Sequence, residues 1–311
     1  MLRLKVAATL LSGTLVLGMG GAVAAVSRSR LNTAPTLQAI KSYVLAGEKL
    51  TTLPASLSDQ LTLMPYDFYS SPPCVVGGGS TIPTHCEFGD KSSKNIVVLD
   101  GDSFAGMWFP TLDAIATKHK LKMYLVSRLA CPFALVSVSA SCKSWQANAA
   151  TYINSLKPTA IVFASENLSP LQPSQVAITP KEYAVGISSA LATFTSPHVR
   201  KIVLLGMPAV AFGSPSTAVE PNGCIAGHLK SLRSCAIPLA TALIKIRIED
   251  DTAAAKSAGA TPVSVTSLFC QTTCPMVVDK NLVFADPFHL NVNYAGILSS
   301  ALAELIGVRK L

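Results

Sequence analysis

Residues 95–118 read NIVVLDGDSFAGMWFPTLDAIATK. The apolar, β-branched run at Ile96–Leu99 predicts a buried strand, and the segment Phe104–Lys118 predicts a helix. Between them Gly101 permits a tight exit from the strand. Ser103 is therefore expected at or near the start of the helix, where its hydroxyl is exposed and close to the positive end of the helix dipole.

The same alternation continues through the rest of the chain. Further strands are predicted at Leu121–Val126, Thr159–Ala164, Lys201–Leu205 and Pro262–Val265. Further helices are predicted at Lys143–Leu156, Lys181–Phe194, Ile237–Ser257 and Tyr294–Ile306. Apolar strands separated by helices predict an α/β fold, a three-layer sandwich with a five-stranded parallel sheet flanked by helices. A ligand site is then expected beyond the carboxyl ends of the strands.

The length and composition of the chain indicate one main domain. Its 311 residues are 50% hydrophobic and 14% charged, which suits one sizeable core. We expect the catalytic domain at residues 95–311 and an N-terminal extension at residues 25–94, with a helix at Thr36–Leu50. Within the extension, residues 71–90 read SPPCVVGGGSTIPTHCEFGD, which predicts a disulfide loop without regular structure.

The first 24 residues have the layout of a secretion signal. Arg3 and Lys5 precede the apolar run Val6–Leu17, and Ala22-Val23-Ala24 forms a small-residue cleavage site. An uncleaved membrane anchor is the alternative interpretation. Either way, the protein is expected outside the cytoplasm, in a bacterial periplasm or secreted.

The eight cysteines agree with export because they fall into neighbouring pairs. These pairs are Cys74 with Cys86, Cys131 with Cys142, Cys224 with Cys235, and Cys270 with Cys274. An even, clustered count predicts disulfides, although eight cysteines allow about 105 connectivities. A structural zinc site is disfavoured because the five histidines are scattered and no C-x-x-C pair occurs.

The formal net charge is +8, but the positive residues form no dense run interleaved with aromatics. Nucleic-acid binding is therefore disfavoured. A solvated basic surface explains the charge more simply than attraction to anionic cell-surface polymers or lipid headgroups.

A serine nucleophile at Ser103 would need a base, and the sequence offers one good candidate. Four histidines have simpler surface or loop explanations: His85, His119, His198 and His228. His289 belongs to the stretch FADPFHLNVNYAG, where Asp286 lies three residues earlier and can reach the imidazole. In this arrangement Asp286 fixes the tautomer of His289, and His289 serves as base toward Ser103. The alternatives are an Asx-turn at Asp286 and an ordinary N-cap at Asp102 or Ser103.

The two blocks together resemble the SGNH hydrolase family, whose nucleophile lies in a G-D-S block and whose acid and base lie in a late D-x-x-H block. Here these are Gly101-Asp102-Ser103 and Asp286-Pro287-Phe288-His289. The neighbouring segments CEFGD, GDSFAGMWFPTL, CKSW and DPFHLN are more narrowly similar to the extracytoplasmic SGNH domain fused to membrane acyltransferase-3 proteins. The resemblance covers roughly Leu53 to the C-terminus and implies an SGNH/flavodoxin-like fold.

The sequence departs from the family pattern around the second and third blocks. Phe104 follows the nucleophile where this subfamily often has His, and the second strand ends in Val126-Ser127-Arg128 without a glycine. Asn167, after the third strand, is where an oxyanion-hole asparagine is expected, beside the backbone N–H of Ser103. Arg128 and Trp108 are candidates for substrate binding. The alternative for Arg128 is a solvent-facing or salt-bridged side chain, and the alternative for Trp108 is packing in the core or between helices.

The resemblance implies acyl-ester chemistry on a cell-envelope glycan, by O-acyl transfer or hydrolysis through an acyl-serine. It implies no metal and no other cofactor. The partners would be the glycan, an acyl-ester donor and a separate membrane acyltransferase. A noncatalytic glycan-binding or assembly protein on the same fold is the alternative function.

Overall fold

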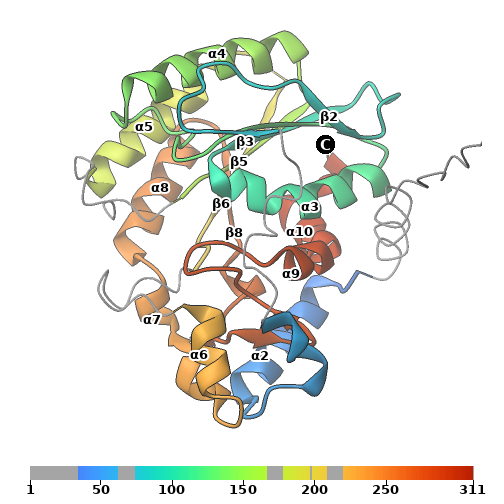
Figure 1. Cartoon of the computed structure of the whole chain (residues 1–311). Coiled ribbons are helices and arrows are strands. Elements are labelled where there is room, and N and C mark those ends of the chain that lie inside the picture. The colour runs from blue at the N-terminus through green and yellow to red at the C-terminus, as the bar shows by residue number, and fades with distance from the viewer. Residues whose placement is uncertain (1–33, 62–73, 167–177, 197, 209–219, 311) are drawn as a thin grey trace, which may run out of the picture.

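The computed structural model describes residues 34–61, 74–166, 178–196, 198–208 and 220–310. The signal, residues 1–24, lies outside this part of the chain. A parallel sheet runs through the centre in the order β4-β3-β5-β6-β8 (Figure 1). Its strands are β3 (Ile96–Gly101), β4 (Lys122–Arg128), β5 (Ala160–Ala164), β6 (Arg200–Leu205) and β8 (Thr261–Ser264). All five lie where the sequence predicts them.

Two further short strands extend the sheet beyond β4. β1 (Val75–Val76) pairs parallel with β4, and β2 (Cys86–Gly89) pairs antiparallel with it. The sheet therefore has seven strands. The prediction of an irregular loop for residues 71–90 was wrong at these two places, because β4 would otherwise leave its edge hydrogen-bonding groups open and the extension covers them.

Helices cover both faces of the sheet, as expected (Figure 1). α3 (Ser103–Lys118), α9 (Val292–Ile297) and α10 (Ser299–Ile306) pack with one core cluster, which contains Val97 and Leu99 of β3. α4 (Ala140–Leu156), α5 (Pro180–Ala192) and α8 (Lys245–Ser257) cover the other, which contains Val98. Successive side chains of one strand point to opposite faces, so β3 contributes to both clusters.

Two predicted helices are interrupted in the structure. The segment expected as one helix at Ile237–Ser257 begins with β7 (Ile237–Pro238), which pairs with β9 (Thr273–Cys274), and continues as α7 (Leu239–Ala242) and α8. Pro238 has no N–H for a helical hydrogen bond, and this favours the break. The segment at Tyr294–Ile306 divides into α9 and α10, because the Ala295 carbonyl accepts from Leu298 N and from the hydroxyl of Thr111.

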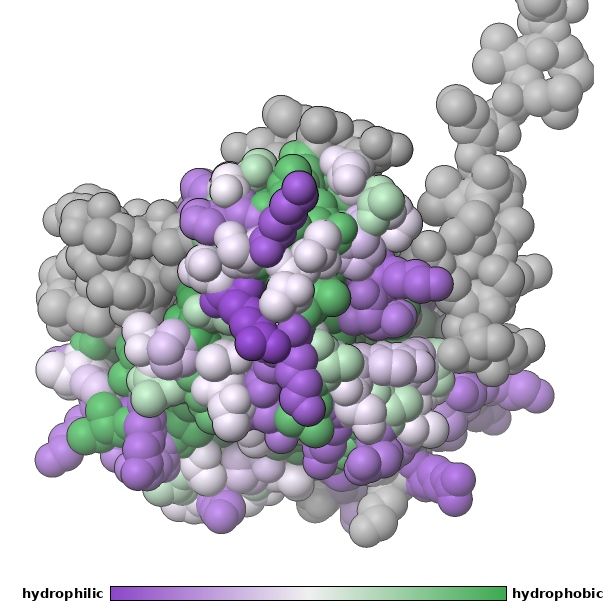
Figure 2. Space-filling view, turned by 90° about the horizontal axis from the view of Figure 1, so that it is seen from below, coloured by the Kyte–Doolittle hydropathy of each residue, from purple (hydrophilic) through white to green (hydrophobic). Residues whose placement is uncertain are grey.

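Small elements complete the described chain. They are η1 (Ala55–Leu57), η2 (Asp59–Leu61), α6 (Pro221–Gly227), η4 (Leu232–Cys235), η5 (Thr266–Leu268), η6 (Val308–Lys310) and the antiparallel pair β10 (Val277–Val278) and β11 (Asn281–Leu282). No helix within the described ranges is long and apolar enough to cross a membrane. The face that carries α6 and α2 mixes hydrophilic and hydrophobic residues without one broad apolar area (Figure 2).

The N-terminal extension shares its core with the rest of the protein. α2 (Leu37–Lys49) lies at the predicted position, and its buried Ile40 and Val44 join the same cluster as α3 and α10. The structure contains the four expected disulfides, Cys74–Cys86, Cys131–Cys142, Cys224–Cys235 and Cys270–Cys274. Residues 74–94 contribute β1 and β2 to the main sheet, so packing is continuous across the expected boundary at residue 94.

Candidate active site

Ser103 is the first residue of α3 and is separated from Gly101, the last residue of β3, by Asp102 alone. The N-cap is Asp102, whose Oδ1 accepts the N–H of Phe104 at 2.8 Å. Gly101 has φ +152°, and a Cβ there would overlap the carbonyl oxygen of Ala164 on β5. Only glycine therefore allows β3 to turn into α3 so close to β5. Because Asp102 provides the cap, Ser103 is not needed for that role.

Asp286 and His289 form the local pair that the D-x-x-H spacing predicts. Oδ1 of Asp286 accepts the backbone N–H of Phe288 and of His289, each at 2.7 Å, and Oδ2 lies 2.7 Å from Nδ1 of His289. The carboxylate thus makes an Asx-type turn and orients the imidazole at the same time. An ionised carboxylate only accepts hydrogen bonds, so this contact places the proton on Nδ1 and leaves Nε2 as the basic nitrogen.

Electrostatics keep Asp286 ionised. Burial alone would raise the pKa of its carboxyl, but the hydrogen bond and charge of His289 and the two backbone N–H groups outweigh that effect. The pKa of Asp286 therefore lies below its usual value. The side chain of His289 is 15% exposed, and its Nε2 is buried within the site.

Tertiary contacts bring the histidine loop against the start of α3. The ring centroids of Phe104 and His289 are 5.8 Å apart, and the N–H of Leu290 donates to Sδ of Met107 at 3.4 Å. Phe104 follows Ser103 directly, and Met107 lies one turn later in α3. The three predicted residues Ser103, Asp286 and His289 are thereby gathered at one end of the sheet.

Asp102 also ties together the carboxyl ends of three strands. Its Oδ2 accepts the N–H of Glu166 after β5 at 2.9 Å, and its carbonyl accepts the hydroxyl of Ser127 in β4 at 2.7 Å. Burial, with a smaller contribution from the charge of Glu166, raises the pKa of Asp102 to about 7. Burial also raises the pKa of Glu166, against the opposing charges of His289 and Arg247.

A buried network supports the Glu166 backbone from the α5–α8 side. The hydroxyl of Tyr183 donates to the carbonyl of Glu166 at 3.1 Å, and the guanidinium of Arg247 stacks 3.5 Å from the centre of the Tyr183 ring. Nε of Arg247 lies 3.1 Å from Oδ2 of Asp251, and both side chains are 1% exposed. Sequence reasoning missed this network. The only local signal was the four-residue spacing of Arg247 and Asp251 on one helix.

The remaining predicted site residues lie elsewhere. Asn167 is outside the described residues. Trp108 is 1% exposed and packs edge-on against Phe269 with centroids 6.0 Å apart, so it has a core role instead of the expected sugar-stacking role. Arg128 is also 1% exposed and donates to the carbonyl of Gly78 and, at 2.9 Å, to the hydroxyl of Ser141. It holds the first disulfide loop against α4 instead of facing an open pocket.

One group of potential metal ligands occurs in the described part of the chain, namely Cys224, His228 and Cys235. The two cysteines form a disulfide, so neither supplies the thiolate that a metal ion would need. Nδ1 of His228 lies 2.9 Å from the carbonyl oxygen of Cys224, a contact within its own helical turn.

Comparison with known proteins identifies a matching family and solved structures with a similar fold. The family model for the SGNH domain (fused to AT3 domains) matches residues 73–304. No curated protein sequence matches the chain. Among solved structures, the periplasmic domain of a lipopolysaccharide acetyltransferase from Salmonella ser. Paratyphi A is similar with 16% identity and a TM-score of 0.54, covering 71% of this chain and 85% of that one. A putative acylhydrolase from Bacteroides fragilis shares 14% identity with a TM-score of 0.43, covering 72% and 91%. At such identities the likeness concerns the fold.

Proposed function

The chain belongs to the family of SGNH domains that are fused to AT3 domains, and from this premise we propose that it transfers or hydrolyses O-acyl groups of a cell-envelope polysaccharide through an acyl-serine at Ser103. Family membership supports acyl-ester chemistry in general. The observation that carries the specific proposal is the 2.7 Å contact between Asp286 and His289, in a loop that packs against the first turn of α3.

In the first half of the reaction, Nε2 of His289 takes the proton of the Ser103 hydroxyl while its oxygen attacks the ester carbonyl. Asp286 holds the Nδ1 proton and stabilises the imidazolium. The backbone N–H of Ser103, together with Asn167, binds the tetrahedral oxyanion. The N–H of Phe104 is already bonded to Asp102, so it is not our candidate for this donor. His289 then returns its proton to the leaving alcohol, and the acyl group remains on Ser103.

In the second half, His289 takes a proton from water or from a glycan hydroxyl, and the resulting oxygen nucleophile attacks the acyl-serine. The C–O bond to Ser103 breaks, and His289 returns the proton to the serine oxygen. Water gives a free acid, whereas a glycan hydroxyl gives an O-acylated glycan. The choice depends on which acceptor the site orients.

We place this chemistry outside the cytoplasm, with a separate membrane acyltransferase as the source of acyl groups. The four disulfides favour an oxidising compartment. The family description links such domains to AT3 domains. Co-purification from membranes without any acyltransferase would contradict this part of the proposal.

The first test is a colorimetric acetyl-ester assay on native protein, Ser103→Ala and the control Ser144→Ala, whose serine is exposed on α4. We expect Ser103→Ala to lose nearly all activity and Ser144→Ala to keep it. Equal activity in native protein and Ser103→Ala would contradict the mechanism. Inactivity of all three proteins would favour the noncatalytic glycan-binding alternative.

A second assay separates the two reactions. The protein is incubated with an acyl-ester donor and oligosaccharides of envelope glycan, and the masses of the products are measured by mass spectrometry. A mass gain on the oligosaccharide identifies transfer, whereas release of free acid with unchanged oligosaccharide identifies hydrolysis.

A further inference from the structure

A hollow lies between α4 and α5, on the face of the sheet that carries α8. α5 packs along α8 but makes little contact with α4, although the two helices are neighbours over the sheet. The space between them measures about 540 Å³, and the loop between β4 and α4 forms one of its walls. That volume lies in the ordinary range of small-ligand sites. Ser103, Asp286 and His289 do not line it.

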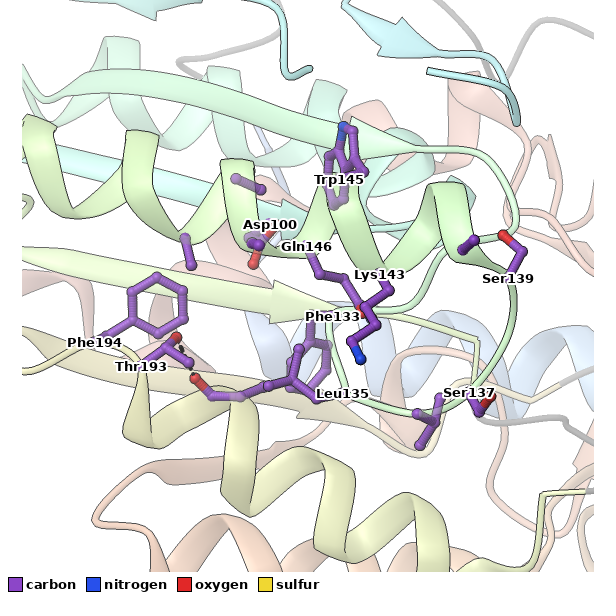
Figure 3. Close-up of a pocket in the computed structure, with 16 residues that line it drawn as sticks. Asp100, Phe133, Leu135, Ser137, Ser139, Lys143, Trp145, Gln146, Thr193 and Phe194 are labelled. Atoms are coloured by element: carbon purple, nitrogen blue, oxygen red, sulfur yellow. Dashed lines mark hydrogen bonds between the residues drawn. The ribbon is translucent and has the colours of Figure 1, made fainter. Parts of the chain in front are cut away.

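Small side chains keep one end of this groove open and apolar. α4 presents alanines where larger residues would fill the space, among them Ala149 and Ala150, and α5 contributes Ala190. Phe133 and Phe194 supply aromatic walls. Figure 3 shows Phe194 at the end of the groove farthest from Ser137 and Ser139. This end offers a mainly apolar surface for an alkyl chain.

The other end of the groove is polar. Ser137 and Ser139 lie at that end, and the exposed Lys143 projects from α4 into the opening between these serines and Phe194 (Figure 3). Among the described residues that line the groove, Lys143 is the only cation. The nearby Gln146 amide is engaged, because it donates to the carbonyls of Pro132 and Ala134. The charge of Lys143 therefore favours binding of an anion at this end of the groove.

Asp100 lies beneath α4, between the two ends of the groove (Figure 3). Asp100 is 5% exposed, and its buried Oδ1 has no hydrogen-bond partner in the structure. A buried polar atom without a partner is costly and is normally satisfied by a ligand or water. Burial raises the pKa of Asp100 to about 8, so the carboxyl is mostly protonated at neutral pH and can donate a hydrogen bond.

We propose that this groove binds an aliphatic monocarboxylate of medium chain length. Its carboxylate accepts a charge-assisted hydrogen bond from Lys143, and its chain runs past Asp100 and the alanines toward Phe194. From Lys143 to Ala150 the helix advances about 10 Å, the length scale of such a chain. An amine of equal length would be repelled by Lys143, and an alcohol would lack the charge that Lys143 attracts.

Tryptophan fluorescence gives a direct binding assay. The chain has two tryptophans, of which Trp145 lines the groove and Trp108 packs in the core cluster on the opposite face of the sheet. The probes are octanoate, octanol and octylamine, each titrated separately. We expect a saturable change with octanoate and at least about tenfold weaker binding of the other two, as expected for loss of a charge-assisted hydrogen bond. Equal binding of all three, or no saturable change with octanoate, would overturn the proposal.

Two variants locate the bound molecule. Lys143→Glu changes only an exposed side chain and should weaken octanoate binding at least about tenfold, whereas the matched control Lys256→Glu on α8 should not. Ala150→Phe should fill the groove and abolish binding, whereas Ala253→Phe, at an exposed position of α8, should not. Native-like binding by Lys143→Glu overturns the proposal even if Ala150→Phe does not fold.

This inference does not depend on the proposed active site. Ser103→Ala should bind octanoate like native protein while it loses esterase activity. Loss of octanoate binding in Ser103→Ala, with retention in Lys143→Glu, would assign the fatty acid to the catalytic site and overturn the groove.

Discussion

At the scale of single residues, one carboxylate performs two tasks. Asp286 accepts two backbone N–H groups, which fix the loop, and the Nδ1 proton of His289, which fixes the ring. The same atoms therefore set both the backbone conformation and the tautomer. Asp100 is the opposite case, a carboxyl that is buried without a partner for Oδ1.

Replacing Asp286 with asparagine should separate orientation from charge. The amide oxygen of the Asp286→Asn variant can still accept from the backbone, but the neutral side chain no longer stabilises an imidazolium and can favour the wrong tautomer. We expect esterase activity to fall by roughly a thousandfold or more with little change in melting temperature. Asp279→Asn, at an exposed turn, is the control. Near-native activity of Asp286→Asn would show that His289 works without this partner.

Asp100 should make stability fall as pH rises. Its pKa is raised to about 8 in the folded protein, from 3.8 as the ordinary value. Between these values the folded state binds a proton that the unfolded state has released, so native stability declines with increasing pH, by an amount on the order of several kcal/mol. Asp100→Asn cannot titrate, and its stability relative to native protein should increase from pH 5 to pH 8.

Urea unfolding of both proteins across this pH range measures the difference. Asp279→Asn again serves as control, because that aspartate is exposed. A difference between native protein and Asp100→Asn that stays constant with pH would mean that Asp100 titrates normally.

At the scale of elements, α2 is fastened to the last disulfide loop. The carboxylate of Glu48 accepts the backbone N–H groups of Gln271, Thr272 and Thr273 at 2.8 to 2.9 Å, and the hydroxyl of Thr272 at 3.0 Å. Successive N–H groups that converge in this way form an anion-binding nest. This contact joins the extension to the loop between Cys270 and Cys274, which includes the first residue of β9.

Glu48→Gln should weaken that connection. Burial raises the pKa of Glu48, but the backbone N–H groups and the Thr272 hydroxyl outweigh it, and the pKa is lowered overall. The contribution of Glu48 is therefore present above its unfolded pKa of 4.5 and is lost as pH falls through the lower folded value. We expect the free energy of unfolding to drop by about 1 to 3 kcal/mol at pH 7.

The drop caused by Glu48→Gln should shrink as the solution is acidified below pH 4.5, when measured by urea unfolding. Lys41→Gln on the same helix is the matched control. A pH-independent drop would indicate a packing effect instead of a charge effect.

At the scale of the whole molecule, the disulfides are distributed around the sheet and not concentrated at the site. Three of them join cysteines that are 12, 11 and 11 residues apart, and the fourth joins cysteines 4 apart. Each therefore constrains a local segment, including the β1–β2 edge and the start of α4. The longer loops should each contribute roughly 3 kcal/mol, and the shortest should contribute least.

Nonreducing peptide mass mapping should recover the four neighbouring pairs, and reduction should lower the melting temperature. Without the cross-links the unfolded chain has more conformational entropy, and this favours unfolding. Free thiols throughout protein isolated without reductant would contradict both the pairing and the proposed extracytoplasmic location. A melting temperature unaffected by full reduction would contradict the energetic expectation alone.

Much of the fold was predictable because it depends on local patterns. The five parallel strands are short apolar runs flanked by helices, and each lies at its predicted position. The errors occur where a distant residue changes the local outcome. Thr111 bonds to the Ala295 carbonyl between α9 and α10, and β9 pairs with Ile237 and Pro238 before α7. Neither contact can be recognised from the hydrophobic pattern of the segment whose helix it interrupts.

Local sequence was enough to predict the strand-to-helix junction at Ser103 and the Asp286–His289 pair, because both depend on residues within three positions of each other. Three features became visible only in the folded chain: the histidine loop packs on α3, Tyr183 and Arg247 support the backbone beside Asp102, and alanines leave a groove over Asp100. These features join side chains from separate elements, and their energies depend on burial and distance, which exist only once the chain has folded.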